Sequence, residues 1–172
     1  YLDSTPTHSY MKYLYKYPQA EFPYPDLVDT SRCRGRNEFE YELMDTGVFD
    51  DNRYFDVFVE YAQADPEDIL MRVTAINRGP EPAPLHLLPQ LWFRNTWSWS
   101  AGGAKPQLMD VDEAEVLAEH AALGSYRLYL DGAPGLLFTG NDTNVPGLYG
   151  GAVQGYFKDA FHERVVDGNT AA

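Results

Sequence analysis

Two neighbouring segments near the middle of the chain place apolar residues at every second position, and this period constrains the fold more than any other sequence feature. Residues 54–61 carry Phe, Val, Val and Tyr in this way, and residues 69–76 carry Ile, Met, Val and Ala. A period of two is typical of β-strands, because successive side chains point to opposite faces of a sheet. The turn residues at 64–68 therefore predict two antiparallel neighbours.

Further strands are expected on either side of this pair. Glu38–Leu43 alternates in the same way, and residues 84–93 are expected to add another strand to an antiparallel meander. Residues 126–139 predict a separate hairpin. Residues 112–123 suit either a short helix capped by Asp112 or a strand.

The remaining segments are expected to be less regular. Prolines at positions 18, 23 and 25 exclude helix interiors and central strands, so the first third up to residue 37 is predicted to be irregular. Residues 140–155 are rich in glycine and predict a long loop. Residues 156–166 show helical spacing of their apolar side chains and predict a short helix or turn.

Apolar residues also occupy the nominally outer positions of the predicted strands, among them Leu70, Ile76, Leu88 and Trp92. Partial cover on both faces favours two packed layers over a single open sheet. We therefore predict an all-β fold: an antiparallel two-layer β-sandwich with long loops and one or two short helices. A chain of 172 residues has the length of one domain, so residues 1–172 are expected to form a single sandwich domain.

The charge balance narrows the range of partners. The chain carries 26 acidic against 13 basic side chains, a net charge of −13. Nucleic acids and anionic membrane surfaces both attract clustered Lys and Arg, so neither is an expected partner. No apolar run reaches the ~18 residues of a membrane-spanning helix. The single cysteine, Cys33, has no partner for an internal disulfide, and a bacterial cytoplasmic location is expected.

Side chains capable of acid–base, nucleophilic or metal chemistry are present but form no recognisable motif. Neighbouring carboxylates lie in turns, and the four histidines are scattered singly. The sequence has no Gly-x-Ser-x-Gly elbow, glycine-rich phosphate loop or zinc-ligand spacing. A calcium site remains an alternative, with oxygen ligands from Asp45, Asp50, Asp51, Asn52 and Asp56. We expect no catalytic residue, metal ligand or cofactor in this chain.

The segment Leu91–Ser100 is the most distinctive motif, because it combines tryptophans at a period of two with polar neighbours. The flat indoles of Trp97 and Trp99 can stack on sugar rings, beside which Arg94 and Asn95 can bond hydroxyl groups. Alternatively, and in our preferred interpretation, the tryptophans fill the core or a seam between domains. The candidate substrate-binding or interdomain contacts are Arg94, Asn95, Trp97, Trp99, Tyr156 and His162.

Nine short runs of residues form a recognisable series along the chain. They are Thr5–Tyr10, Tyr15–Gln19, Phe39–Leu43, Asp45–Gly47, Arg53–Val57, Asn77–Pro80, Leu85–Pro89, Leu91–Trp97 and Tyr156–His162. Their order and spacing resemble those of bacterial proteins assigned to glycoside hydrolase family 63. The resemblance covers nearly the whole chain and is weakest around residues 101–121.

The resemblance implies a larger enzyme, in which an N-terminal β-sandwich precedes an (α/α)6 barrel that hydrolyses α-glucosidic bonds with inversion. The family's catalytic acid and base lie in the barrel, and no position of this chain matches their motifs. We therefore expect a fragment of the N-terminal region that packs on the C-terminal (α/α)6 catalytic domain of the same polypeptide. An oligosaccharide is a second candidate partner. Two alternatives stay open: an autonomous carbohydrate-binding module and a complete small enzyme.

Overall fold

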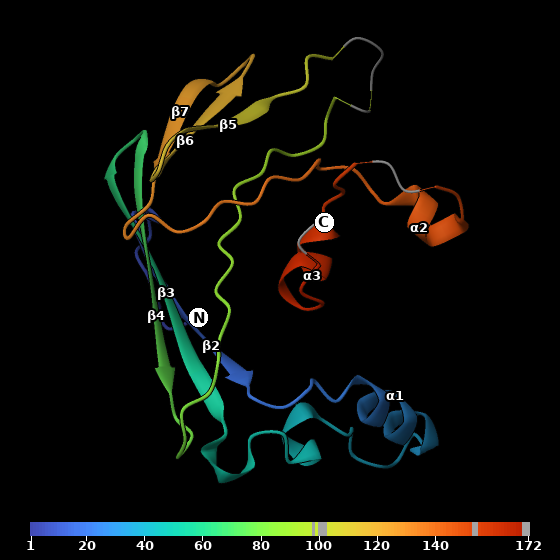
Figure 1. Ribbon diagram of the computed structural model, residues 1–172. Helices are drawn as coiled ribbons and strands as arrows, with labels where there is room; N and C mark the ends of the chain where they lie inside the picture. Colours follow the sequence, from blue (N-terminus) through green and yellow to red (C-terminus); the bar gives the residue numbers. More distant parts are fainter. Residues whose placement is uncertain (98, 100–102, 153–154, 170–172) are drawn as a thin grey trace. The chain divides into compact units, whose positions relative to one another are not determined.

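The computed structural model describes residues 1–97, 99, 103–152 and 155–169, and its described strands form two antiparallel sheets (Figure 1). The chain divides into two compact units, Tyr1–Leu87 and Leu88–Ala172. One sheet of four strands belongs to the first unit and one of three strands to the second, and the described helices are short. The predicted all-β antiparallel class is confirmed, whereas the packing of the two sheets as a single sandwich domain stays a prediction.

The first unit is an antiparallel meander with the strand order β1-β2-β3-β4. Its strands are β1 (Asp3–Ser4), β2 (Tyr10–Pro18), β3 (Tyr54–Asp65) and β4 (Asp68–Asn77). The connection between β2 and β3 contains helix α1 (Tyr24–Cys33) and the short 3₁₀ turns η1 (Leu43–Thr46) and η2 (Asp50–Asn52). The two strands expected from their alternation, β3 and β4, are confirmed together with the turn that joins them.

The register gives this sheet one apolar face, because directly paired residues of antiparallel strands share a face. Tyr13 pairs with Val59, which pairs with Val73. The same face continues through β2, β3 and β4 with Met11, Tyr15, Tyr17, Phe55, Val57, Tyr61, Met71 and Ala75. Phe55 and Val59 are the buried residues among them, at 4% and 9% exposure. This face is the surface that a predicted second layer would cover.

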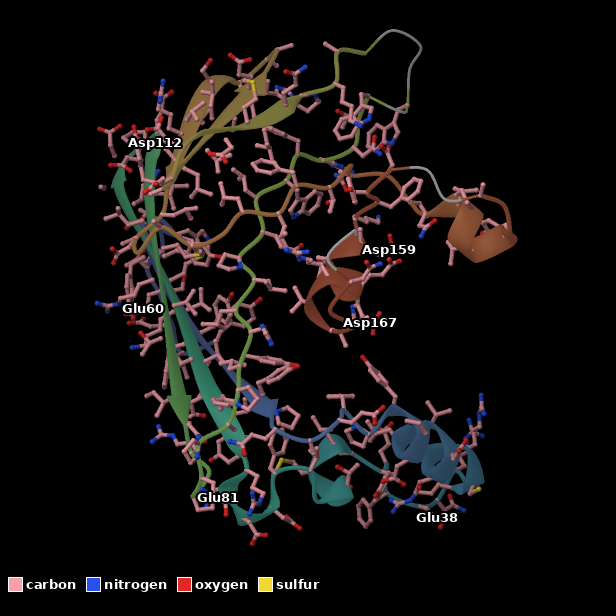
Figure 2. All side chains as sticks on the ribbon, in the orientation of Figure 1. Glu38, Glu60, Glu81, Asp112, Asp159 and Asp167 are labelled. Atoms are coloured by element: carbon pink, nitrogen blue, oxygen red, sulfur yellow. The ribbon has the colours of Figure 1, made fainter. Side chains whose placement is uncertain are left out.

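The opposite face carries rows of ion pairs. Lys12, Glu60 and Arg72 are directly paired across β2, β3 and β4, and Glu60 is labelled in Figure 2. Its carboxylate accepts hydrogen bonds from the Tyr10 hydroxyl and from Arg72, both at 2.8 Å. These bonds hold the pKa of Glu60 below its ordinary value, while the bond to Glu60 raises the pKa of Tyr10. Opposite charges in register stabilise this pairing of strands.

Two predictions for the first unit are wrong. The Tyr10–Tyr17 segment is a strand, which ends at Pro18, and Pro25 lies in the first turn of α1, where a missing N–H breaks no helical bond. Conversely, no strand forms at residues 38–43. There the Asp45 carboxylate accepts the N–H of Glu42 at 2.8 Å, and this local bond favours a turn over a ladder.

The strand expected at residues 84–93 is also absent, and these residues form no ladder. Prolines at positions 80, 82, 84 and 89 explain the difference, because each removes a backbone donor that a sheet would need. The antiparallel meander therefore exists, but its additional strands are β1 and β2, which precede β3 in the sequence.

The second unit holds the sheet β5-β6-β7 and two short helices. Its elements are β5 (Gln107–Asp112), β6 (Glu115–His120), β7 (Gly124–Tyr129), α2 (Val145–Tyr149) and α3 (Ala160–Val165). Val116 and Ala118 of the central strand are buried, each at 4% exposure. The open choice at 112–123 is resolved in favour of a strand, and the short helix expected at 156–166 is confirmed as α3. The hairpin predicted at 126–139 is wrong, because β7 pairs with β6 instead.

Candidate functional site

The second unit presents an exposed aromatic surface, here called the aromatic loop and defined as the described residues between Trp92 and Trp99. It carries the three tryptophans of the chain. Trp92 is 62% and Trp99 67% exposed, while Trp97 is half-buried. Two backbone bonds fold it into consecutive turns: the Thr96 N–H donates to the Arg94 carbonyl and the Trp99 N–H to the Thr96 carbonyl. Trp99 is thus exposed within the described residues, and the filling of a core or of a seam between domains by these rings stays a prediction.

Two asparagine side chains join the aromatic loop to a distant segment. The Asn95 amide donates to the backbone carbonyl of Asn141 at 3.0 Å, and the Asn141 amide donates back to the carbonyl of Phe93 at 2.7 Å. The two contacts span 46 and 48 positions of sequence. These reciprocal bonds tie the loop at residues 93 and 95 to the segment around Asn141.

Each of two tryptophans carries a cation over its ring. The Arg94 guanidinium lies 5.0 Å from the ring centroid of Trp99, and the Lys105 ammonium lies 5.6 Å from that of Trp97. Lys105 also donates to the Asp142 carboxylate at 3.1 Å, next to Asn141. Cation–π contacts of this type favour a defined ring orientation. They also occupy one face of each indole, so a sugar ring could stack only on the other face.

The two remaining candidates differ in their relation to this assembly. The Tyr156 carbonyl accepts the N–H of Gly140 at 2.7 Å, which places its backbone beside the segment that braces the loop. Its side chain is 56% exposed. His162 lies in α3, and its described contacts are with Phe161 and with the backbone of neighbouring turns. The structure thus brings Arg94, Asn95, Trp97, Trp99 and Tyr156 together and leaves His162 apart.

Asn141, Asp142 and Lys105 are parts of the assembly that sequence reasoning missed. Each is a common surface residue type in a loop, and none forms a local pattern with the aromatic run. Only the approach of residues 140–142 to residues 93–95 in the fold gives them a role.

The described residues show neither a metal-binding cluster nor a membrane-spanning helix. Of the proposed calcium ligands, Asp45 caps a turn and Asp56 is bound by two cations. In the described ranges, no three His, Cys, Asp or Glu side chains gather in a way that could hold a metal ion. No helix of the described chain is both long and apolar enough to span a membrane. Cys33 is an exposed thiol at the end of α1.

Comparison with known proteins shows that the chain is similar to one part of a longer protein. It is 36% identical to the uncharacterized protein YMR196W of Saccharomyces cerevisiae, in an alignment that includes the whole of this chain. The chain spans only 19% of that protein's length. The alignment is 209 positions long, so the yeast protein carries insertions relative to this chain. No family model matches the chain. No solved structure matches it either.

Proposed function

We propose that this chain is a non-catalytic β-sandwich domain of a larger glycoside hydrolase, an inverting α-glucosidase of the family 63 type. In this proposal the aromatic loop packs on the (α/α)6 catalytic domain of the same polypeptide and shapes access of the substrate. The observation that carries it is the aromatic loop itself, which holds exposed rings on a braced backbone.

Exposure and rigidity together support a contact surface. Large apolar side chains in solvent are unfavourable when they are clustered, and clusters on an ordered scaffold typically mark interfaces. Trp and Arg, here stacked as Trp99 and Arg94, are also the residues that dominate binding energy at interfaces. Because Asn95 and Asn141 anchor the loop at residues 93 and 95, less conformational entropy is lost on binding a partner than for an unanchored loop.

The length of the relative supports a partner within the same polypeptide. The chain matches only a part of a longer protein, 19% of that protein's length. A domain that occurs within a longer chain has neighbouring domains at high effective concentration, so even a modest interface remains closed. The alternative of an autonomous carbohydrate-binding module is less well supported, because Arg94 and Lys105 each cover one face of the rings that such a module would use.

The first experiment measures the mass of the native protein in its source cells with an antibody against this domain. The proposal predicts a band far above the 19.5 kDa of this chain. A band at that mass would contradict it. The larger protein, once purified, is expected to hydrolyse α-glucosides and to release β-glucose first, as followed by NMR.

A pair of variants then tests the role of the aromatic loop in that larger protein. The double change Trp97→Ala, Trp99→Ala is expected to lower kcat/KM by about tenfold, on the order of 1.4 kcal/mol of transition-state stabilisation, since removing both rings removes the contact that shapes access of the substrate. Tyr129→Ala is the matched control, because Tyr129 is a 69% exposed ring in the same unit but outside the loop. Equal kcat/KM for both variants and the unaltered protein would contradict the proposal.

A further inference from the structure

β4 is the longest edge strand of the two described sheets. It has ten residues, whereas the other edge strands β1, β5 and β7 have two, six and six, and in the described chain it pairs on one side only, with β3 (Figure 1). Proteins commonly protect such an edge with proline or lysine, because an open edge pairs readily with another strand. Between Ile69 and Asn77, β4 has neither residue type, and its one charged side chain is that of Arg72.

The backbone bonds of the sheet show which groups of β4 point outward. The Arg78 N–H donates to the Tyr54 carbonyl at 2.9 Å, which places these two residues in a hydrogen-bonded pair. Bonded and non-bonded pairs alternate along antiparallel strands, so the even-numbered residues of β4 bond to β3. The odd-numbered residues direct their N–H and C=O groups to the open edge. They are Ile69, Met71, Val73, Ala75 and Asn77.

The backbone of β4 can pair with itself about Val73. When a second copy lies antiparallel and centred there, Val73 meets Val73 of that copy. Met71 then meets Ala75, and Ile69 meets Asn77. Each of these residues has its donor and acceptor on the open edge, so the ladder of hydrogen bonds extends along the whole strand.

The side chains fit the same register, because directly opposed residues of antiparallel strands share a face. Leu70 meets Ile76 of the second copy, and these side chains are 58% and 37% exposed in the single chain. Asp68 at the start of β4 meets Arg78, which follows its end. Arg78 bonds to Asp56 through Nε, but its side chain is still 44% exposed. Two-fold symmetry forms the apolar pair and the charge pair twice.

Neighbouring registers are less favourable. A centre on Arg72 sets this guanidinium against that of the second copy, and a centre on position 75 sets it against Arg78. Like charges directly opposite each other destabilise a pair of strands. A centre on position 74 opposes Arg72 to Ile76 and forms no charge pair. Centres nearer the start of β4 leave its last residues opposite the preceding turn.

We propose that the protein forms a homodimer in which β4 pairs antiparallel with β4 of a second copy, centred on Val73. The two meanders become one continuous sheet, with their apolar faces on the same side. The interface is one strand wide, so the dimer is expected to dissociate on dilution between about 100 and 1 μM. The inference goes beyond the proposed function and does not depend on it, because dimerisation requires no catalysis.

Opposite charges introduced at Thr74 test the register in the native protein. This exposed residue meets Arg72 of the second copy, and symmetry makes the contact twice. Thr74→Lys is expected to raise the dissociation constant of the dimer about fivefold and Thr74→Glu to lower it about fivefold. Sedimentation equilibrium measures both, and thermal unfolding confirms that each variant is folded. Ser125→Lys and Ser125→Glu, on the exposed edge strand β7, are the matched controls and are expected to change neither mass nor dissociation.

Hydrogen exchange then tests the pairing itself. The amides of the five odd-numbered residues are expected to exchange more slowly as the protein concentration rises. The even-numbered amides of β4, which already bond to β3, are expected to exchange at rates independent of concentration. Mass spectrometry with fragmentation of the labelled peptide distinguishes the two sets.

Three results would overturn the proposal. The first is a native protein that stays monomeric throughout this range of concentrations. The second is a dimer whose dissociation constant moves in the same direction, or not at all, with Thr74→Lys and Thr74→Glu. The third is protection of the odd-numbered amides that is equal at all concentrations, because a strand of the same polypeptide would then cover the edge. A monomer that hydrolyses α-glucosides would contradict only the dimer, and a dimer that does not would contradict only the proposed function.

Discussion

At the scale of single residues, Asp56 is the most consequential side chain of the first unit. It is 4% exposed, and its carboxylate accepts hydrogen bonds from Lys16 at 2.8 Å and from Arg78 at 2.6 Å. The bond from Lys16 and then that from Arg78 hold the pKa of Asp56 below its ordinary value, against the opposing effect of burial. A buried carboxylate with both oxygens satisfied links β2, β3 and the residue after β4.

Asp56→Asn is expected to lower the free energy of unfolding by about 2 kcal/mol at pH 7, because it leaves two cations without their buried partner. Lys16 and Arg78 are partly exposed, so water limits the loss. Asp29→Asn is the control: it removes an equal charge from an exposed pair with Arg32 and is expected to cost at most about 0.5 kcal/mol. Urea unfolding measures both, and equal values would contradict the assigned role.

The same pair of variants predicts a pH dependence. A carboxylate whose folded pKa is depressed contributes stability above its unfolded pKa and loses that contribution as pH falls through the folded pKa. The ordinary value for Asp56 is 3.8. The difference in unfolding free energy between the unaltered chain and Asp56→Asn is therefore expected to be constant above about pH 5 and to shrink below about pH 4. A difference that persists unchanged at pH 2 would exclude this origin.

At the scale of elements, the sheet of the first unit shows which strands are predicted by local sequence and which pairings depend on distant residues. The alternation of β3 and β4 predicts both strands, because side-chain period and turn chemistry are local properties. β2 alternates as well, but its mixed aromatic and basic side chains and the prolines at positions 18, 23 and 25 point to an irregular segment. Its pairing with β3, in which Lys16 meets Asp56, joins residues 40 positions apart and cannot be inferred from either segment alone.

Neighbouring positions of β4 test the assignment of the two faces. Ala75 belongs to the apolar face and Thr74 to the face with the ion pairs, and both are exposed. If the apolar face is a sandwich interior, Ala75→Asp is expected to cost about 2–4 kcal/mol through an unpaired buried charge. Thr74→Asp makes a similar change in the same strand and is expected to cost about 1 kcal/mol or less. Thermal unfolding that ranks the two variants equally would contradict a covered apolar face.

The aromatic loop and its brace illustrate the limit of sequence reasoning at the same scale. The run of aromatic and polar residues at 91–100 is visible in the sequence and predicts a contact region. The brace depends on Asn141, whose two bonds form only after the loop around residues 140–142 has reached residues 93–95. β5 was likewise not expected, because Gln107–Asp112 has too few residues to show a clear period.

At the scale of the whole molecule, the account depends on what covers the aromatic loop. The chain matches a part amounting to 19% of a longer relative. Its own described residues leave Trp99 and Trp92 more than half exposed. The sequence predicts the all-β class correctly, since that class follows from local alternation. A surface shared with another domain leaves only an indirect trace in the sequence, namely large aromatic residues in a loop.

The most direct test places the photoreactive residue p-benzoyl-phenylalanine at position 99 of the native protein and identifies its cross-linked peptides by mass spectrometry. The same residue at position 129 is the control, since Trp99 and Tyr129 are similarly exposed, at 67% and 69%. The account predicts that position 99 cross-links to peptides of the same polypeptide outside residues 1–172 and that position 129 does not. Cross-links from position 99 that stay within residues 1–172 would contradict it.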